Sequence, residues 1–192
     1  MTHGSNKWVQ SYRAARKRHA DARLEAYDAA RTDAITSGGL GLPLRFTDID
    51  EHALEVWRAT WRQPHSVDAG GWDWSRLVSG MPHRAAVLPL AIWYGDDLCG
   101  LALGYASRSR AGGVRHTVLL THVERRPDPP QVPLRGHIIP LAVAVAQNYG
   151  YALGASRLLL RNPDPRVVSY YEQLGFDVAW KGSRPVYCEK EI

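Results

Sequence analysis

The segment that most limits the fold of this chain is Ile138–Leu153, an apolar stretch of about four helical turns with almost no polar side. A helix without a polar side has to be buried, because a surface helix presents a polar stripe to water. Shorter apolar runs at 116–123 and 156–160 flank this segment and suit buried strands. The pattern predicts a helix packed on a sheet, in an α/β or α+β fold.

A β-rich region precedes that helix. The apolar runs 85–94 and 98–105 are separated by the turn 95–97, which is typical of an antiparallel hairpin. Pro89 lies inside the first run and predicts a bulge or an edge position, because proline has no N–H for a strand ladder. Further short strands are expected at 43–46, 176–180 and 186–189.

Two shorter helices are expected beside these strands. One follows Thr47 and Asp48, either of which can cap its start. The other covers 166–174, with Pro165 near its first position and Gly175 closing it.

The first 39 residues differ in composition from the rest. No glycine or proline lies between Ser5 and Ile35, so helix propensity is high, and the breaker sequence 37–39 ends the segment. We expect a basic helical extension over 1–39 and one domain over 40–192. Four basic residues cluster in the extension: Arg13, Arg16, Lys17 and Arg18. This helix packs on the domain, or it contacts nucleic acid or a macromolecular acceptor; it can also serve a homodimer.

Charge and cysteine usage narrow the possible partners and compartments. The net charge of +5 and a pI of about 9.4 favour anionic partners. Cys99 and Cys188 lie far apart without metal-like spacing, so we expect two small buried side chains, no disulfide and no metal site. No apolar run reaches the length of a bilayer span and the N-terminus is polar. We therefore expect a cytoplasmic protein that does not enter a membrane.

The C-terminal part carries a recognisable pattern: Asn162-Pro163-Asp164 after a short strand, then Tyr170-Tyr171-Glu172-Gln173-Leu174-Gly175-Phe176. This resembles the closing motif of the GNAT (GCN5-related N-acetyltransferase) family, and the order of expected elements over 44–189 is similar too. The resemblance implies a mixed, mostly antiparallel sheet flanked by helices, which opens between two neighbouring strands to hold acetyl-CoA. It further implies an acyl-CoA-dependent N-acyltransferase, with an acceptor amine of unknown size.

The same resemblance implies which residues hold acetyl-CoA. Backbone groups near His122 and Val123 would pair with the pantetheine arm, as in strand addition. The phosphate loop best matches 135–140, so Arg135, Gly136, His137 and Ile138 would face the pyrophosphate at a helix start. Ile138 and Pro140 stand where the family has small residues, and Pro140 has no N–H to donate. Asn162 would contact the cofactor arm, or act as a helix N-cap, or both.

The family's chemistry implies a proton donor and a base. Tyr171 matches the tyrosine that protonates the leaving thiolate, and Tyr170 competes if the register slips by one; a core tyrosine is the alternative. Glu124 and His122 are candidate bases on one face of a strand. A solvated Glu124 paired with Arg125 or Arg126 is equally open.

Two wider questions also stay open. The tryptophans of the region before the hairpin line an acceptor pocket or pack in the core: Trp57, Trp61, Trp72 and Trp74. As an alternative function, the altered phosphate loop and the basic N-terminal helix favour a GNAT-fold protein that does not use CoA and binds or modifies nucleic acid or a macromolecular partner.

Overall fold

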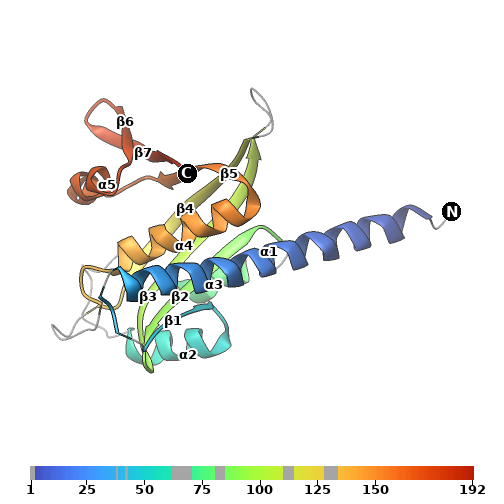
Figure 1. The fold of residues 1–192 in the computed structure, drawn as a ribbon, viewed down its shortest axis with the longest axis horizontal. Coiled ribbons are helices and arrows are strands. Elements are labelled where there is room, and N and C mark those ends of the chain that lie inside the picture. The colour runs from blue at the N-terminus through green and yellow to red at the C-terminus, as the bar shows by residue number, and fades with distance from the viewer. Residues whose placement is uncertain are drawn as a thin grey trace.

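The computed structural model of this chain describes residues 3–37, 39–41, 43–61, 71–80, 85–109, 115–127 and 134–192. Its elements are, in chain order, α1 (His3–Thr36), β1 (Leu44–Asp48), α2 (Glu51–Thr60), α3 (Trp74–Ser79), β2 (Val87–Tyr94), β3 (Asp97–Ser109), β4 (Arg115–Arg125), α4 (Ile138–Leu153), β5 (Ala155–Arg161), the 3-10 turn η1 (Pro165–Val167), α5 (Val168–Gln173), β6 (Asp177–Lys181) and β7 (Arg184–Glu191). Figure 1 shows how they are arranged. The sequence predicts a polar, arginine-bearing loop over 107–113 and a proline-rich loop over 125–133; residues 110–113 and 128–133 of these loops lie outside the described residues, and 107–109 belong to β3.

The strands form one seven-stranded sheet in the order β1-β2-β3-β4-β5-β7-β6. Every neighbouring pair is antiparallel except β4 and β5, which run parallel. This confirms the predicted mixed, mostly antiparallel sheet flanked by helices. Within the described residues no helix has the length and hydropathy that crossing a membrane requires.

Pro89 shows how the sheet tolerates a proline in an inner strand. Strand β2 lies between β1 and β3, and its register irregularity falls at Ile92 and Trp93, not at the proline. Pro89 lies just past the last β1 residue that pairs with β2, and its carbonyl accepts a hydrogen bond from the N–H of Ile49. The missing N–H therefore points to the side on which β1 has already ended, so the ladder with β3 loses no donor.

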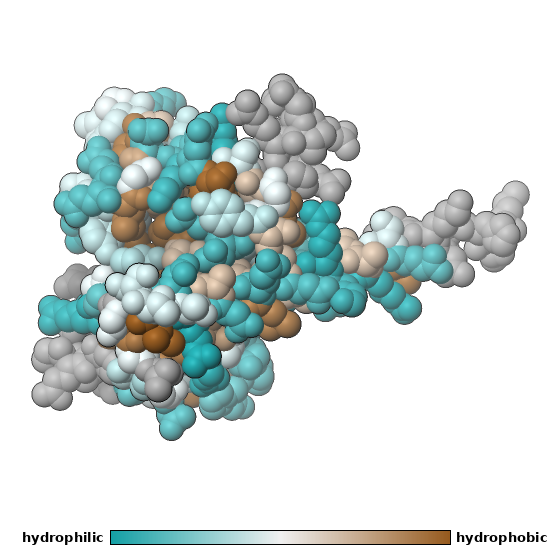
Figure 2. Space-filling model, viewed as in Figure 1, coloured by the Kyte–Doolittle hydropathy of each residue, from teal (hydrophilic) through white to brown (hydrophobic). Residues whose placement is uncertain are grey.

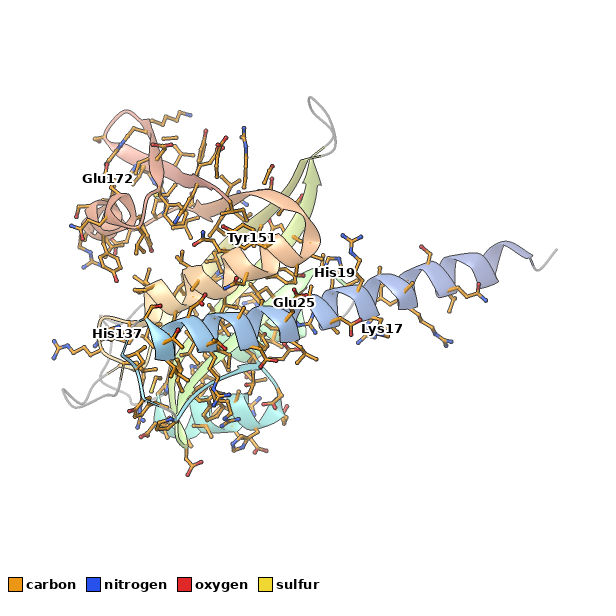
Figure 3. All side chains as sticks on the ribbon, viewed as in Figure 1. Lys17, His19, Glu25, His137, Tyr151 and Glu172 are labelled. Atoms are coloured by element: carbon orange, nitrogen blue, oxygen red, sulfur yellow. The ribbon has the colours of Figure 1, made fainter. Side chains whose placement is uncertain are left out.

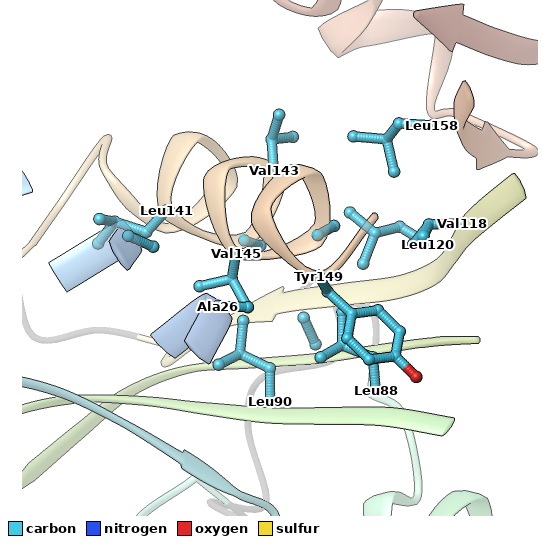
Figure 4. Packing of buried hydrophobic residues seen from close by; sticks show 14 of the residues in the cluster. Ala26, Leu88, Leu90, Val118, Leu120, Leu141, Val143, Val145, Tyr149 and Leu158 are labelled. Atoms are coloured by element: carbon cyan, nitrogen blue, oxygen red, sulfur yellow. The ribbon is translucent and has the colours of Figure 1, made fainter. Parts of the chain in front are cut away.

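Helices cover the two faces of the sheet unequally. Helices α1 and α4 lie on one face, and Figure 4 shows Val145 and Tyr149 of α4 against Leu88 and Leu90 of β2. Helices α2 and α3 pack a second, tryptophan-rich cluster on the other face of β2 and β3. The predicted helix Ile138–Leu153 has the bounds of α4, and nine of its sixteen residues are buried, as its apolar composition requires.

The second half of α1 is part of the main core. Ala22, Ala26 and Ala30 are buried there, and small side chains let the helix approach α4 closely. Arg23 donates two hydrogen bonds of 2.9 Å to the carboxylate of Asp48, and the hydroxyl of Tyr27 donates a third at 2.8 Å. The boundary expected at residue 39 stays a prediction, while this half of α1 packs in the same core as the sheet.

The start of α2 differs from the sequence prediction. Asp50 is the N-cap, and its carboxylate accepts a hydrogen bond from the N–H of Ala53 at 2.8 Å. Thr47 and Asp48, expected as caps, are the last residues of β1 instead. The Asp48 carboxylate binds α1, and the Thr47 hydroxyl accepts a hydrogen bond from the indole of Trp93 at 3.0 Å, so neither side chain serves the helix.

Candidate active site

The sheet opens where β4 continues beyond the last residue that pairs with β5. The two strands pair from His116 to Leu120, while β4 continues to Arg125. At the point of divergence Thr121 is an extra residue in β4, since Leu103 pairs with His122 and Gly104 with Leu120. Such a bulge bends a strand and redirects its side chains. The result is a strand end, residues 121–125, with one edge unpaired among the described strands; we call it the open edge of β4.

His122 and Glu124 share the face of the open edge that looks toward α3. Their partners across the ladder, Leu103 and Leu101, belong to the tryptophan-rich cluster. Val123 faces the other way and packs against the main core. The structure thus brings together the two candidate bases, as their alternation along a strand predicted.

Glu124 is held by the two tryptophans beside it. Its carboxylate accepts a hydrogen bond from the indole N–H of Trp74 and another from the backbone N–H of Trp72. Burial raises the pKa of Glu124, and the two hydrogen bonds offset this only in part. Among the described residues Glu124 forms no salt bridge, and Arg126 pairs with Asp97 instead. The interpretation of Glu124 as an arginine-paired surface residue is therefore wrong.

His122 is enclosed by the same aromatic pair. Its ring lies edge-on to Trp72 at a centroid distance of 4.5 Å and to Trp74 at 6.4 Å. Its Nδ1 is 2.9 Å from the hydroxyl of the bulged Thr121. Burial lowers the pKa of His122, so the neutral imidazole is favoured near pH 7. The Glu124 carboxylate bonds to the tryptophans and not to this ring, so the carboxylate does not orient the imidazole, and the two groups are separate candidates for a base.

The tryptophans divide between the core and the surroundings of His122 and Glu124. Trp57, Trp61 and Trp74 are buried, whereas Trp72 is 43% exposed and reaches His122. Trp74 belongs to both categories, because its ring packs in the core while its N–H binds Glu124. Sequence analysis left core and pocket open for all four residues, since composition alone does not fix where an indole N–H points.

The start of α4 lies at the loop expected to bind phosphate; Figure 3 labels His137 there. His137 occupies the cap position without a side-chain hydrogen bond, and Arg135, Gly136 and His137 are exposed. The N–H groups of Ile138 and Ile139 have no acceptor among the described residues. The helix therefore begins with two N–H donors and the positive end of its dipole, beside an arginine and a histidine.

Ile138 does not obstruct this helix start. Its side chain is buried and packs on Gly100 of β3. A Cβ on Gly100 would lie 2.7 Å from Cγ2 and 3.0 Å from Cδ1 of Ile138, so only glycine leaves room for this contact. The isoleucine at a position where the family has a small residue thus points into the core, and its backbone N–H remains at the helix start.

Tyr171 and Tyr170 have different environments. Tyr171 is 9% exposed, packs edge-on against Phe176 at 6.2 Å, and burial raises its pKa to about 12. Among the described residues its hydroxyl has no hydrogen-bond partner. The hydroxyl of Tyr170 donates to the carbonyl of Gly136 at 3.2 Å and so links α5 to the loop before α4. The Tyr171 hydroxyl therefore stays protonated near pH 7, whereas the Tyr170 hydroxyl already donates its proton to a hydrogen bond.

Asn162 is not the N-cap of the last helix. Asp164 caps the 3-10 turn that leads into α5, and its carboxylate accepts from the N–H of Arg166. Asn162 instead has a φ of +50°, a conformation that asparagine tolerates better than most residues. Its N–H donates to the carbonyl of Val186 at 3.0 Å, so it turns the chain away from β5. The cap prediction is wrong because the first helical turn begins at Pro165, so the cap position falls on Asp164.

Sequence reasoning missed three contributors to this site: Thr121 as the bulged residue, Gly100 as the seat of Ile138, and the Trp74 indole as a ligand of Glu124. A glycine within an apolar strand was the only available signal for the role of Gly100.

The described residues contain no group of three side chains suited to a metal ion. Cys99 and Cys188 are free and buried, as predicted.

Comparison with solved structures shows that the chain has the fold of the GNAT acetyltransferases. No protein-family sequence profile matches the chain and no curated protein is significantly similar to it in sequence. Among solved structures, a transcriptional regulator from Bacillus halodurans is similar, with a TM-score of 0.56, 15% identity, and coverage of 72% of this chain and 96% of that one. A GNAT-family acetyltransferase from Listeria monocytogenes has a TM-score of 0.50, 15% identity, and coverage of 82% and 98%. An Arabidopsis thaliana protein in complex with the bisubstrate analogue CoA-Ac-MVNAL has a TM-score of 0.50, 10% identity, and coverage of 79% and 100%.

Proposed function

We propose that this chain, which has the fold of the GNAT acetyltransferases, is an N-acyltransferase that moves an acetyl group from acetyl-CoA to an amine. The observation that carries the proposal is the open edge of β4, where a desolvated carboxylate, Glu124, lies beyond the point at which β4 and β5 separate. An unpaired strand edge can bind the amides of an extended arm by strand addition. A desolvated carboxylate next to that edge suits proton removal from an amine.

The residues around the opening fit acetyl-CoA. The backbone of His122 and Val123 belongs to the open edge of β4. The N–H groups at the start of α4, with Arg135 and His137 beside them, suit a pyrophosphate. Ile138 leaves this helix start open because its side chain packs on Gly100. Pro140 removes one donor of the first turn, so Ile138 and Ile139 carry the backbone contribution.

Acetyl-CoA supplies an activated acyl group as a thioester. In the proposed reaction Glu124 accepts the proton that the acceptor amine loses, directly or through water. His122, kept neutral by burial, can take the same proton if the amine approaches from its side. The Tyr171 hydroxyl donates its proton to the departing thiolate, and its raised pKa keeps that proton available at neutral pH. The products are the N-acetylated amine and CoA.

Binding is tested by calorimetric titration of the full chain with acetyl-CoA and with CoA. Micromolar binding supports the proposal. Arg135→Glu should weaken it at least tenfold, because a negative charge then faces the pyrophosphate, whereas Arg76→Glu makes the same charge change on exposed surface of α3 and should not. Absence of binding at millimolar ligand would contradict the proposal and favour the alternative, a GNAT-fold protein that works without CoA.

Chemistry is tested by following CoA release with a panel of amines and peptides. Glu124→Gln and Tyr171→Phe should each lower kcat by about 10²-fold or more while the dissociation constant of acetyl-CoA stays unchanged. Tyr170→Phe is the matched control for the second variant, since it removes the neighbouring hydroxyl. Full turnover by Tyr171→Phe would remove that residue from the mechanism.

A further inference from the structure

The net charge of this protein is concentrated at one end of one helix. The chain contains 24 Lys and Arg and 19 Asp and Glu. Residues 3–18, which we call the N-terminal arm, hold five of the basic residues and no acidic one. The remainder therefore carries 19 residues of each sign, and the net +5 belongs to the arm alone.

The arm extends beyond the body of the protein. Helix α1 meets the C-terminal end of α4 through Arg18, which donates to the carbonyl of Leu153, and through His19, whose ring nitrogen lies 2.8 Å from the Tyr149 hydroxyl. The part of α1 before these contacts runs past the sheet and α4 (Figure 1). Where Figure 2 colours this part by hydropathy, its surface is largely hydrophilic. At 1.5 Å per residue the arm is about 24 Å long.

The basic side chains of the arm are available to an anionic partner. Arg13, Arg16, Lys17 and Arg18 are all exposed. Arg18 also donates the hydrogen bond to the Leu153 carbonyl, whose length of 3.4 Å marks it as weak, so a phosphate can replace that acceptor. The ion pair between Lys17 and Asp21 involves side chains that are 78% and 60% exposed, so its stability is slight and a phosphate can replace it. At 100° per residue the four basic positions span about 200° of the helix circumference. Positive charge therefore faces both flanks of the helix.

From these features we infer that the N-terminal arm binds double-stranded DNA by lying in the major groove and contacting phosphates on both strands. A helix 10–12 Å across fits a groove about 12 Å wide, and charge on both flanks matches the two strands. The deep, narrow major groove of duplex RNA does not admit a helix. Contact to phosphates carries no base recognition, so binding should be independent of sequence.

Other occupants of the arm fit less well. A second copy would bring one basic arm toward another, and like charges repel. A membrane surface requires a wide apolar side, yet the large apolar residues of the arm are only Trp8, Val9 and Tyr12. This inference does not depend on the proposed acetyl transfer, for which the pyrophosphate would lie at the opposite end of α4.

The test is fluorescence anisotropy of a labelled 24-base-pair DNA duplex of mixed sequence with the full chain. If four side chains each neutralise one phosphate, the logarithm of affinity should fall with a slope of about −3.6 against the logarithm of salt. This corresponds to a loss of about 100-fold between 50 and 200 mM salt. The variant Arg13→Gln/Arg16→Gln/Lys17→Gln/Arg18→Gln keeps helix propensity, which circular dichroism checks, and should lose most of both affinity and slope.

The matched control removes four exposed positive charges from the body: Arg76→Gln, Arg161→Gln, Lys181→Gln and Arg184→Gln. It changes the net charge equally and should bind DNA within about threefold of the unmodified chain. Equal losses in the two variants would overturn the inference, since net charge alone would then explain binding. Absence of binding at 50 mM salt, tighter binding to duplex RNA, or binding to anionic phosphatidylserine vesicles but not to DNA would overturn it too.

Discussion

Replacing Gly100 by alanine tests how α4 is seated on the sheet. The new Cβ would lie 2.7 Å from Cγ2 of Ile138, and ordinary contact begins near 3.4 Å, so one group has to move by about 0.7 Å. Ile138 cannot easily rotate away, because a β-branched residue in a helix has one strongly preferred χ1. The start of α4 is therefore pushed off β3 in the variant.

The cost of this replacement is the difference of two contributions. Overpacking of a buried contact typically costs about 1–3 kcal/mol. Replacing glycine by alanine in a strand by itself stabilises the folded state by about 0.5–1 kcal/mol, because the unfolded chain loses conformational entropy. We expect Gly100→Ala to lower the free energy of unfolding by about 1–2 kcal/mol, measured by urea denaturation. It should also weaken acetyl-CoA binding, since the helix start moves.

Two second-site variants separate this clash from other effects. Ile138→Ala removes both contacting atoms, so Gly100→Ala should cost nothing further in that background, with a coupling energy of about 1–2 kcal/mol. Ile138→Val removes Cδ1 but keeps Cγ2, the atom nearest the new methyl group, and should relieve little of the clash. A Gly100→Ala protein as stable as the unmodified chain, or a coupling energy near zero, would refute the seating of Ile138 on Gly100.

Three further variants have defined outcomes. Trp74→Phe removes a hydrogen bond that lowers the pKa of Glu124, so that pKa should rise further and the acidic limb of kcat/KM should move to higher pH; an unmoved limb would contradict Glu124 as the base. Asp48→Ala leaves an arginine and a tyrosine hydroxyl of α1 without their acceptor and should cost about 2–4 kcal/mol in urea denaturation, with Asp48→Asn losing less. Tyr170→Phe removes one partly exposed hydrogen bond and should cost at most about 1 kcal/mol; a larger loss would mean that α5 depends on this link.

Much of the fold could be predicted from periodicity and turn chemistry. The bounds of α4 followed from a long, mostly apolar stretch, and the β2–β3 hairpin from two apolar runs around a Gly-Asp turn. Predictions from local sequence signals failed where a side chain forms a contact with a distant part of the chain instead. Asp48 has the chemistry of a helix cap but binds Arg23, and Asp50 serves the helix instead.

The candidate site was only partly predictable for a similar reason. Alternation along a strand placed His122 and Glu124 on one face. The closing motif pointed to Tyr171 with Tyr170 as its competitor, and the role of either tyrosine stays a prediction. The partners of these residues come from distant parts of the chain: Trp74 lies 50 residues from Glu124. No pattern in the sequence specifies that an indole N–H binds a carboxylate across the sheet, because the contact depends on how α3 packs.

The docking of α1 has a consequence for how the chain acquires its structure during synthesis. Its contacts with α4 join residues 130 and 135 positions apart, so α1 is made long before its partner exists. At about 5–20 residues per second the wait is about 7–27 s. During this time the alanine stripe of a 34-residue helix stays open to solvent or chaperones. Ribosome-stalled chains ending before and after α4 should differ in protease protection of α1; equal protection would show that the helix docks elsewhere first.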